Sequence, residues 1–90
     1  MKNVVIRTYS AGVHVGELVS RDGKEVKLTN ARRIWSWKGA NTLHEIALRG
    51  VGAGSRVSEA VGGIVLTEAI EIIAATDEAM KSIGGVKWAK

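Results

Sequence analysis

The chain of 90 residues has no cysteine, no proline and no phenylalanine. Without cysteine it can form neither a disulfide nor a thiolate metal site, so it lacks the two features that most often stabilise small domains. A chain of this length is expected to form one small domain, spanning residues 1–90, that buries only about 60 to 65% of its unfolded surface. We therefore expect self-association to supplement its stability, and predict a homo-oligomer.

Long apolar runs are also absent. No segment approaches the roughly 20 apolar residues of a membrane span, and the apolar run within the first ten residues, MKNVVIRTYS, is too short for a secretory signal. The sequence therefore predicts a cytoplasmic protein with no membrane partner.

Positive charge is in excess but is not concentrated. Thirteen Lys and Arg residues against nine Asp and Glu residues give a net charge of +4 and a pI near 9.8. Only Arg32 and Arg33 are adjacent basic residues, and no block of five or more like charges occurs. A long nucleic acid needs a continuous basic stripe, whereas a small phosphorylated metabolite needs a few convergent donors. The pattern favours a pocket for a small anion.

Enzymatic and metal-binding patterns are sparse. His14 and His44 are the only histidines, so a metal site would need both of them together with carboxylates from distant segments. The glycines between Gly50 and Gly54 lack the lysine of a phosphate-binding loop, and we interpret them as a flexible surface loop. The sequence predicts no catalytic residue, no metal and no cofactor.

Turn signals and β-branched residues predict an α+β domain, in which a small antiparallel β-sheet is covered on one face by two short helices. Asp22-Gly23 is the strongest hairpin signal, and Asn30 marks a turn or bulge. Asn41 and Thr76 are expected to cap the helices. The expected strands are 3–8, 13–20, 25–29, 31–37, a short strand within 56–60, and 64–74 with a bulge; the expected helices are 41–48 and 77–83.

An internal repeat relates two parts of the chain. The sequence LTNARRI at 28–34 matches LTEAIEI at 66–72, and a later match with one deletion places Leu43 opposite Met80. We interpret the repeat as two strand-to-helix units. The basic and aromatic side chains of the first unit are replaced in the second by Ile70, Glu71, Ile73 and Ala75. This favours a functional role, rather than a purely structural one, for at least some of the basic and aromatic side chains that are found only in the first unit.

The stretch ARRIWSWKGAN, from Ala31 to Asn41, combines cationic and aromatic groups with a predicted helix start. Guanidinium groups match phosphate oxygens two at a time, indole faces stack on bases, and a helix N-terminus offers N–H groups to anions. In an alternating strand Arg33, Trp35 and Trp37 would share one side. We therefore predict contacts with a phosphorylated nucleotide.

Each of these residues also has an ordinary structural explanation. The two arginines are equally compatible with a charged strand face, and tryptophan in a domain without phenylalanine is most often core. Trp37 lies nearer the predicted turn and is the better stacking candidate. Asn41 can act as an N-cap or read a ribose or base edge.

Arg7 precedes a predicted turn, Tyr9-Ser10-Ala11-Gly12. Backbone N–H groups and the Ser10 hydroxyl can cradle a phosphate oxygen there, and Arg7 would neutralise its charge. The alternative is a solvated arginine at the end of a strand.

Three segments together resemble a family of phage proteins. They are RTYSAGVHVG at 7–16, ARRIWSWKGANTLHEIA at 31–47 and LTEAIEIIAATDEAMKSI at 66–83. Over Val4 to Trp88 the chain is similar to the first type of Thoeris anti-defence protein, the sponges that sequester cyclic ADP-ribose signals.

The resemblance implies binding without turnover. An infected bacterium makes glycocyclic ADP-ribose with a TIR enzyme, and the sponge removes this signal in the host cytoplasm, which blocks Thoeris immunity without any catalytic residue. The resemblance also implies dimers that assemble into hexamers, ligand sites at subunit interfaces, and in some members separate sites for cyclic oligonucleotides. Relatives carry an aromatic residue where Ser36 stands and longer loops where this chain has 50–58, so the preferred cyclic nucleotide stays open.

Residue by residue, the shared motifs imply one ligand-binding set, to which Arg56 is added on its chemistry alone. The set comprises Arg7, Ser10, Ala11, Gly12, Val13, Arg32, Arg33, Trp37, Gly39 and Asn41.

Two other classes of function stay open. The same Arg and Trp residues on an exposed sheet would suit a small basic nucleic-acid-binding protein. A structural oligomerisation protein with no ligand is the third class. Salt dependence distinguishes the sponge from the nucleic-acid-binding protein, because binding to a long strand weakens steeply with salt while binding to a buried two-phosphate ligand responds weakly.

Overall fold

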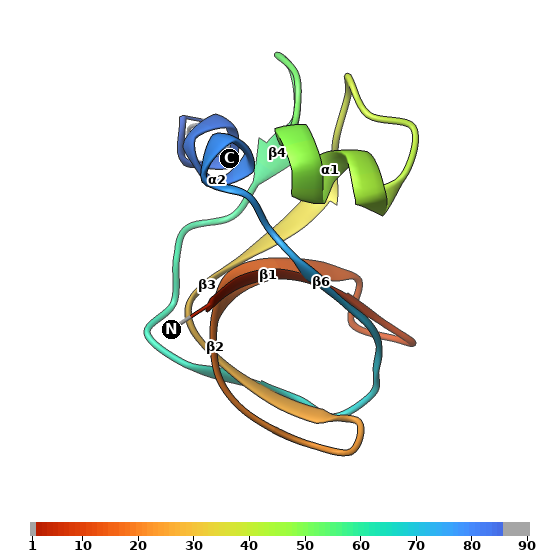
Figure 1. The fold of residues 1–90 in the computed structure, drawn as a ribbon, viewed down its shortest axis with the longest axis vertical. Helices are drawn as coiled ribbons and strands as arrows, with labels where there is room; N and C mark the ends of the chain where they lie inside the picture. The colour runs from red at the N-terminus through yellow and green to blue at the C-terminus, as the bar shows by residue number, and fades with distance from the viewer. Residues whose placement is uncertain (1, 86–90) are drawn as a thin grey trace.

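A computed structural model describes residues 2–85 of the chain (Figure 1), so Trp88, where the resemblance ends, lies outside the described residues. The elements in chain order are β1 (Lys2–Thr8), β2 (Val13–Asp22), β3 (Glu25–Ser36), α1 (Leu43–Arg49), β4 (Arg56–Val57), β5 (Ile64–Leu66), β6 (Ala69–Ala74) and α2 (Asp77–Gly84). The strands form one six-stranded antiparallel sheet in the order β4-β3-β2-β1-β6, with β5 also paired to β3. This architecture is the predicted α+β class.

The sheet curls on itself, and the two helices lie side by side at one end of it (Figure 1). In the middle of β1, both faces of the curled sheet are therefore buried. Val5, in the middle of β1, packs in a cluster with both helices, whereas its neighbours Val4 and Ile6 pack in a second cluster with Val26 and other strand residues. Burial on both faces explains why β1 has three consecutive apolar residues rather than a strict alternation.

β3 is a single bent strand of 12 residues, where the sequence predicted two. Asn30 has φ of +50°, and the register opposite shifts between Val15 and Glu17, so that two β3 residues face Gly16 alone. This is a β-bulge, which bends a strand without ending it. The predicted bulge at Asn30 is confirmed, and the predicted break between two strands is wrong. The preceding hairpin turns at Gly23-Lys24, because Asp22 still pairs with Glu25.

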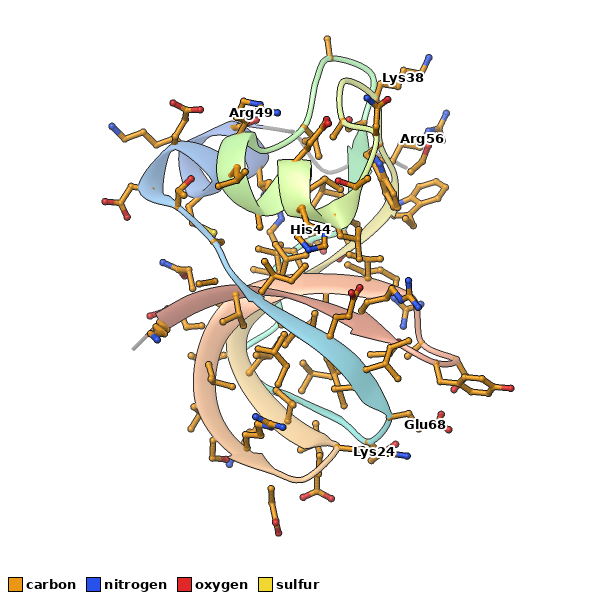
Figure 2. The ribbon with its side chains drawn as sticks, turned by 45° about the vertical axis from the view of Figure 1, so that its right-hand side comes forward. Lys24, Lys38, His44, Arg49, Arg56 and Glu68 are labelled. Atoms are coloured by element: carbon orange, nitrogen blue, oxygen red, sulfur yellow. The ribbon has the colours of Figure 1, made fainter. Side chains whose placement is uncertain are left out.

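The predicted bulged strand over 64–74 is wrong. β5 pairs with β3, whereas β6 pairs with β1, so the chain turns a corner at Thr67 and Glu68 to pass from one part of the sheet to another. Backbone bonds fix this corner: the Tyr9 N–H donates to the Glu68 carbonyl at 3.0 Å, and the Ala69 N–H donates to the Lys24 carbonyl at 3.0 Å. Figure 2 shows Lys24 and Glu68 together at the end of the molecule opposite the helices.

α1 is capped by Thr42, not by Asn41 as predicted. The Thr42 hydroxyl accepts from the Glu45 N–H at 3.3 Å, while the Glu45 carboxylate accepts from the Asn41 N–H at 2.9 Å. Threonine three residues before glutamate is the sequence signature of a capping box, and it identifies the helix start one residue later. Gly50 ends α1 with φ of +84°.

α2 begins after Thr76 and ends at Gly84, close to the predicted bounds. The predicted helix register of the repeat is not kept, because the caps place Leu43 first in α1 but Met80 fourth in α2. Among residues 2–85, no helix is both long enough and apolar enough to cross a membrane.

Candidate functional site

A cavity of about 420 Å³, which we name the Arg7 cavity, lies where β1, β2 and β6 meet the start of α1. Sheet register brings three of its residues together, since Arg7 pairs with Val13 on one side and with Glu71 on the other. Facing residues of antiparallel strands project to the same side of a sheet. The lining residues are Arg7, Val13, Trp37, Asn41, Thr42, Leu43, His44 and Glu71.

The cavity contains one guanidinium and one carboxylate in contact. Nε of Arg7 lies 3.7 Å from Oε1 of Glu71, and the two side chains are 53% and 39% exposed. At this exposure the pair contributes little to stability, so both groups are available to a ligand. Arg7 offers donors to an anion, and Glu71 offers acceptors to hydroxyl or amino groups.

Trp37 supplies the aromatic surface of the Arg7 cavity. β3 ends at Ser36, so strand alternation does not extend to Trp37. Trp37 is partly buried and packs against the cluster beneath the helices, whereas Trp35 is 51% exposed. The prediction that Trp35 and Trp37 lie on one side with Arg33 is therefore wrong at Trp37, because the regular strand stops one residue before it.

The start of α1 supplies the rest of the lining. Asn41, Thr42 and His44 approach the sheet here, and Figure 2 shows His44 between α1 and the strands. The sequence predicted that free N–H groups at the helix start would bind an anion. At Asn41 and Glu45 these N–H groups are already engaged, since they donate to the Glu45 carboxylate and to the Thr42 hydroxyl oxygen. Sequence reasoning considered His44 only as a metal ligand and did not assign Glu71 to the site. Glu71 reaches the cavity because it pairs with Arg7 across the β1–β6 strands, and these two residues lie 64 positions apart in the sequence.

The turn at 9–12 does not present the predicted phosphate cradle. The Ser10 hydroxyl donates to the Glu68 carboxylate, and the Ala11 N–H donates to the Thr8 hydroxyl oxygen at 2.9 Å. The Thr8 N–H and hydroxyl both donate to the Gly12 carbonyl. These bonds hold the turn together and attach it to the corner at Glu68, and none of residues 10–12 lines the Arg7 cavity.

The two adjacent arginines have different surroundings. Arg32 is half-buried: its Nε donates to the Ser58 carbonyl at 2.7 Å, and its Nη1 donates to the Ile83 carbonyl at 3.0 Å. Burial lowers the pKa of Arg32 from its usual value. Arg32 thus ties β3 to the last turn of α2. Arg33 is exposed and lines a separate cavity beside His14.

Gly39 and Arg56 also lie outside the Arg7 cavity. Gly39 has φ of +84° and approaches Gly52 closely enough that a Cβ atom would sit 3.0 Å from the Gly52 nitrogen. This contact between loop backbones accounts for glycine at position 39. The Arg56 guanidinium lies 5.1 Å from the centre of the Trp35 ring, a cation–π pair on the surface. Figure 2 shows Arg56 on the same side of the molecule as Lys38.

The structure therefore gathers four of the predicted residues, Arg7, Val13, Trp37 and Asn41, around one cavity and distributes the others elsewhere. Within residues 2–85, no three His, Asp or Glu side chains lie close enough to hold a metal ion.

The profile of a domain of unknown function, DUF6948, matches residues 1–83. The chain belongs to this family. The DUF6948 match includes every residue of the Arg7 cavity and both helices of the described fold except the last residue of α2. No significant match is found among curated proteins or among solved structures.

Proposed function

We propose that this protein binds a small phosphorylated nucleotide and holds it without turnover. The observation that carries the proposal is that Arg7 from β1, and Trp37 and Asn41 from the loop between β3 and α1, line one cavity of about 420 Å³. A cation, an aromatic face and a side-chain amide are the groups that recognise a phosphate, a base and a ribose or base edge. The volume lies within the range of about 300 to 1,000 Å³ that is usual for small-molecule sites.

The specific ligand we propose is TIR-derived glycocyclic ADP-ribose, sequestered in the cytoplasm of an infected bacterium so that Thoeris immunity is blocked. Arg7 binds a phosphate, Trp37 stacks on adenine, and Asn41 reads a ribose hydroxyl or base edge. The resemblance of 7–16, 31–47 and 66–83 to Thoeris anti-defence sponges supports this choice. In this proposal the protein is not an enzyme and needs no cofactor.

We further propose a homo-oligomer built from dimers, with a hexamer as the final state. Within residues 2–85, β6 pairs with β1 along one edge and with no strand along the other. Its sequence AIEIIA has no lysine or proline to discourage pairing with another chain, and Ile70 is 47% exposed. A free apolar edge strand in a small domain favours association.

A capture experiment tests the proposed function. The purified protein is mixed with glycocyclic ADP-ribose, free ligand is removed by gel filtration, and the protein is then heat-denatured and the supernatant analysed by mass spectrometry. We expect intact ligand in an amount close to one per site. Absence of retained ligand would reject the sponge proposal for this molecule, and an altered product would reject binding without turnover. The same assay with cyclic oligonucleotides tests the second ligand class.

A small nucleic-acid-binding protein is the second candidate, and the Trp35 and Arg56 pair favours it. Trp35 is half-exposed beside an arginine, as in platforms that stack the bases of single strands. Titration of a fluorescent single strand at several salt concentrations separates the candidates. A steep loss of affinity with salt supports nucleic acid, whereas retention of the cyclic nucleotide with weak salt dependence supports the sponge.

A further inference from the structure

A second cavity, which we name the Arg33 cavity, lies beside β3, and it is lined by His14 of β2, whereas the neighbouring Val13 lines the Arg7 cavity on the other face of that strand. Its volume is about 260 Å³, and it is lined by His14, Ala31, Arg33, Ser58, Val61 and Ile64. His14 faces Arg33 across the β2–β3 pairing, and Ala31 belongs to the core cluster inside the curled sheet. The residues of this cavity do not overlap with those of the Arg7 cavity.

Arg33 is the charged group of this cavity. Its Nε donates to Nε2 of His14 at 3.4 Å, and its backbone N–H donates to the Ser58 hydroxyl oxygen at 2.8 Å. Among residues 2–85, no hydrogen bond or ion pair engages its two Nη groups. The guanidinium is thus held at one nitrogen while its outer donors stay available to an anion.

His14 is the group that holds Arg33. It is 2% exposed, and its Nδ1 has no hydrogen-bond partner among the described residues. Because Nε2 accepts the bond from Arg33, the proton of the neutral ring is assigned to Nδ1. Burial, and then the charge of Arg33, lower the pKa of His14, which keeps the ring neutral and able to accept. A buried polar atom with no partner is uncommon in native proteins and marks a site that calls for explanation.

The other residues that line the cavity are apolar, except Ser58, whose hydroxyl is already hydrogen-bonded. Ala31, Val61 and Ile64 contribute alkyl surface. The Ser58 hydroxyl donates to the Glu59 carbonyl at 3.1 Å while it accepts from Arg33, so it has little capacity left for a ligand. A volume of 260 Å³ corresponds to roughly nine water molecules at about 30 Å³ each. The cavity therefore combines one positive charge with apolar space large enough for a molecule of nine non-hydrogen atoms.

We propose that the Arg33 cavity binds a small monocarboxylate with an apolar body, in which the carboxylate is bound by the Nη groups of Arg33 and the body packs on Ala31, Val61 and Ile64. A single guanidinium matches the two oxygens of one carboxylate. The apolar walls of this cavity offer no further donors for the additional oxygens of a phosphate group. This site is separate from the proposed nucleotide site and does not depend on it.

Nuclear magnetic resonance with benzoate as the probe tests the proposal. Benzoate has nine non-hydrogen atoms, one carboxylate and an apolar ring. In the full-length ¹⁵N-labelled protein, we expect benzoate at millimolar concentrations to give saturable shifts of the amide signals of residues 14, 31, 33, 58, 61 and 64, and of the His14 ring nitrogens. Acetate lacks the body and benzamide lacks the charge, so each should bind at least about tenfold more weakly.

Arg33→Met is the decisive variant, because it keeps the length of the side chain and removes its charge. Arg33 is exposed, so the variant should keep the spectrum and melting temperature of a folded protein. We expect it to lose benzoate binding by at least about tenfold, while the matched control Arg21→Met, at the exposed end of β2, keeps it. Equal binding by Arg33→Met, or inorganic phosphate binding as tightly as benzoate, would overturn the proposal. Arg7→Ala should retain benzoate, which separates this result from failure of the nucleotide proposal.

Discussion

Arg7 and Glu71 face each other across the β1–β6 pairing, and their charged groups approach to 3.7 Å. The proposed phosphate anchor therefore carries its own counter-charge within the Arg7 cavity. A phosphate that binds Arg7 competes with a carboxylate already beside it. If the proposed function holds, Glu71 therefore weakens phosphate binding at Arg7, an effect that the sequence did not reveal.

Replacing Glu71 by Gln should strengthen retention of the cyclic nucleotide. An exposed ion pair is worth about 0.2 to 1 kcal/mol, so removal of the competing charge should lower Kd by about 1.5- to 5-fold. Isothermal titration calorimetry measures this change, and Glu25→Gln, at the exposed start of β3, is the matched control. Weaker binding by Glu71→Gln would mean that Glu71 itself accepts a hydrogen bond from the ligand.

Replacing Arg7 by Ala should remove the phosphate contact. Loss of a charged hydrogen bond costs about 1.5 to 3 kcal/mol, which corresponds to a Kd about 10- to 150-fold higher. Calorimetry and the capture experiment should both report the loss, while Arg21→Ala retains ligand. The elution volume should not change in either variant. A shift of Arg7→Ala to a smaller species would assign Arg7 to assembly instead of binding.

Trp35 and Trp37 separate the two candidate functions. Trp37 lines the Arg7 cavity, whereas Trp35 lies half-exposed under Arg56. For a sponge, Trp37→Leu should raise the Kd for the cyclic nucleotide by about 5- to 100-fold, and Trp35→Leu should leave it unchanged. For a nucleic-acid-binding protein, Trp35→Leu should instead weaken binding of a single strand. Fluorescence titration gives both constants, after circular dichroism has verified that each variant folds.

The adjacent arginines should differ in their effect on stability. Arg32→Met removes the bonds to the carbonyls of Ser58 and Ile83, so the free energy of unfolding should fall by about 1 to 3 kcal/mol. Arg33→Met removes one long hydrogen bond to the buried His14 and should lower it by less, about 1 kcal/mol at most. Urea unfolding monitored by tryptophan fluorescence makes the comparison. Equal effects of the two substitutions would contradict the structural role of Arg32.

Stability should fall on acidification because of His14. Burial and the charge of Arg33 lower the pKa of His14 in the folded state. The unfolded chain, with an ordinary histidine pKa near 6.5, then binds a proton that the folded chain does not. The stabilising contribution is complete above about pH 7 and is lost as the pH falls through 6.5 towards the lower folded pKa, with a slope of at most about 1.4 kcal/mol per pH unit. Urea unfolding of the parent and of His14→Leu between pH 8 and 5 should show this slope in the parent only.

The features set by neighbouring residues were predictable. The hairpin at Gly23, the bulge at Asn30 and the cap at Thr76 each depend on the conformational preferences of a few adjacent residues. The cap of α1 was misplaced by one residue because Asn41 and Thr42 are both good caps. The contact of Thr42 with Glu45 decides between them.

The candidate site was predictable only in part. The sequence identified Arg7, Trp37 and Asn41 as chemically suitable residues, and the structure places all three on one cavity. It could not separate Arg32 from Arg33, since the carbonyls that Arg32 binds belong to residues 58 and 83.

By itself, the sequence determined the α+β class, the hairpin at Gly23 and both helices, because local backbone preferences are properties of short segments. Only the tertiary structure decided that 64–74 forms two strands, that Glu71 faces Arg7, and that Arg33 and Arg7 line different cavities. Those outcomes depend on which distant strands pair and in which register. Such pairings depend on which side chains of distant strands become buried together and not on any single segment.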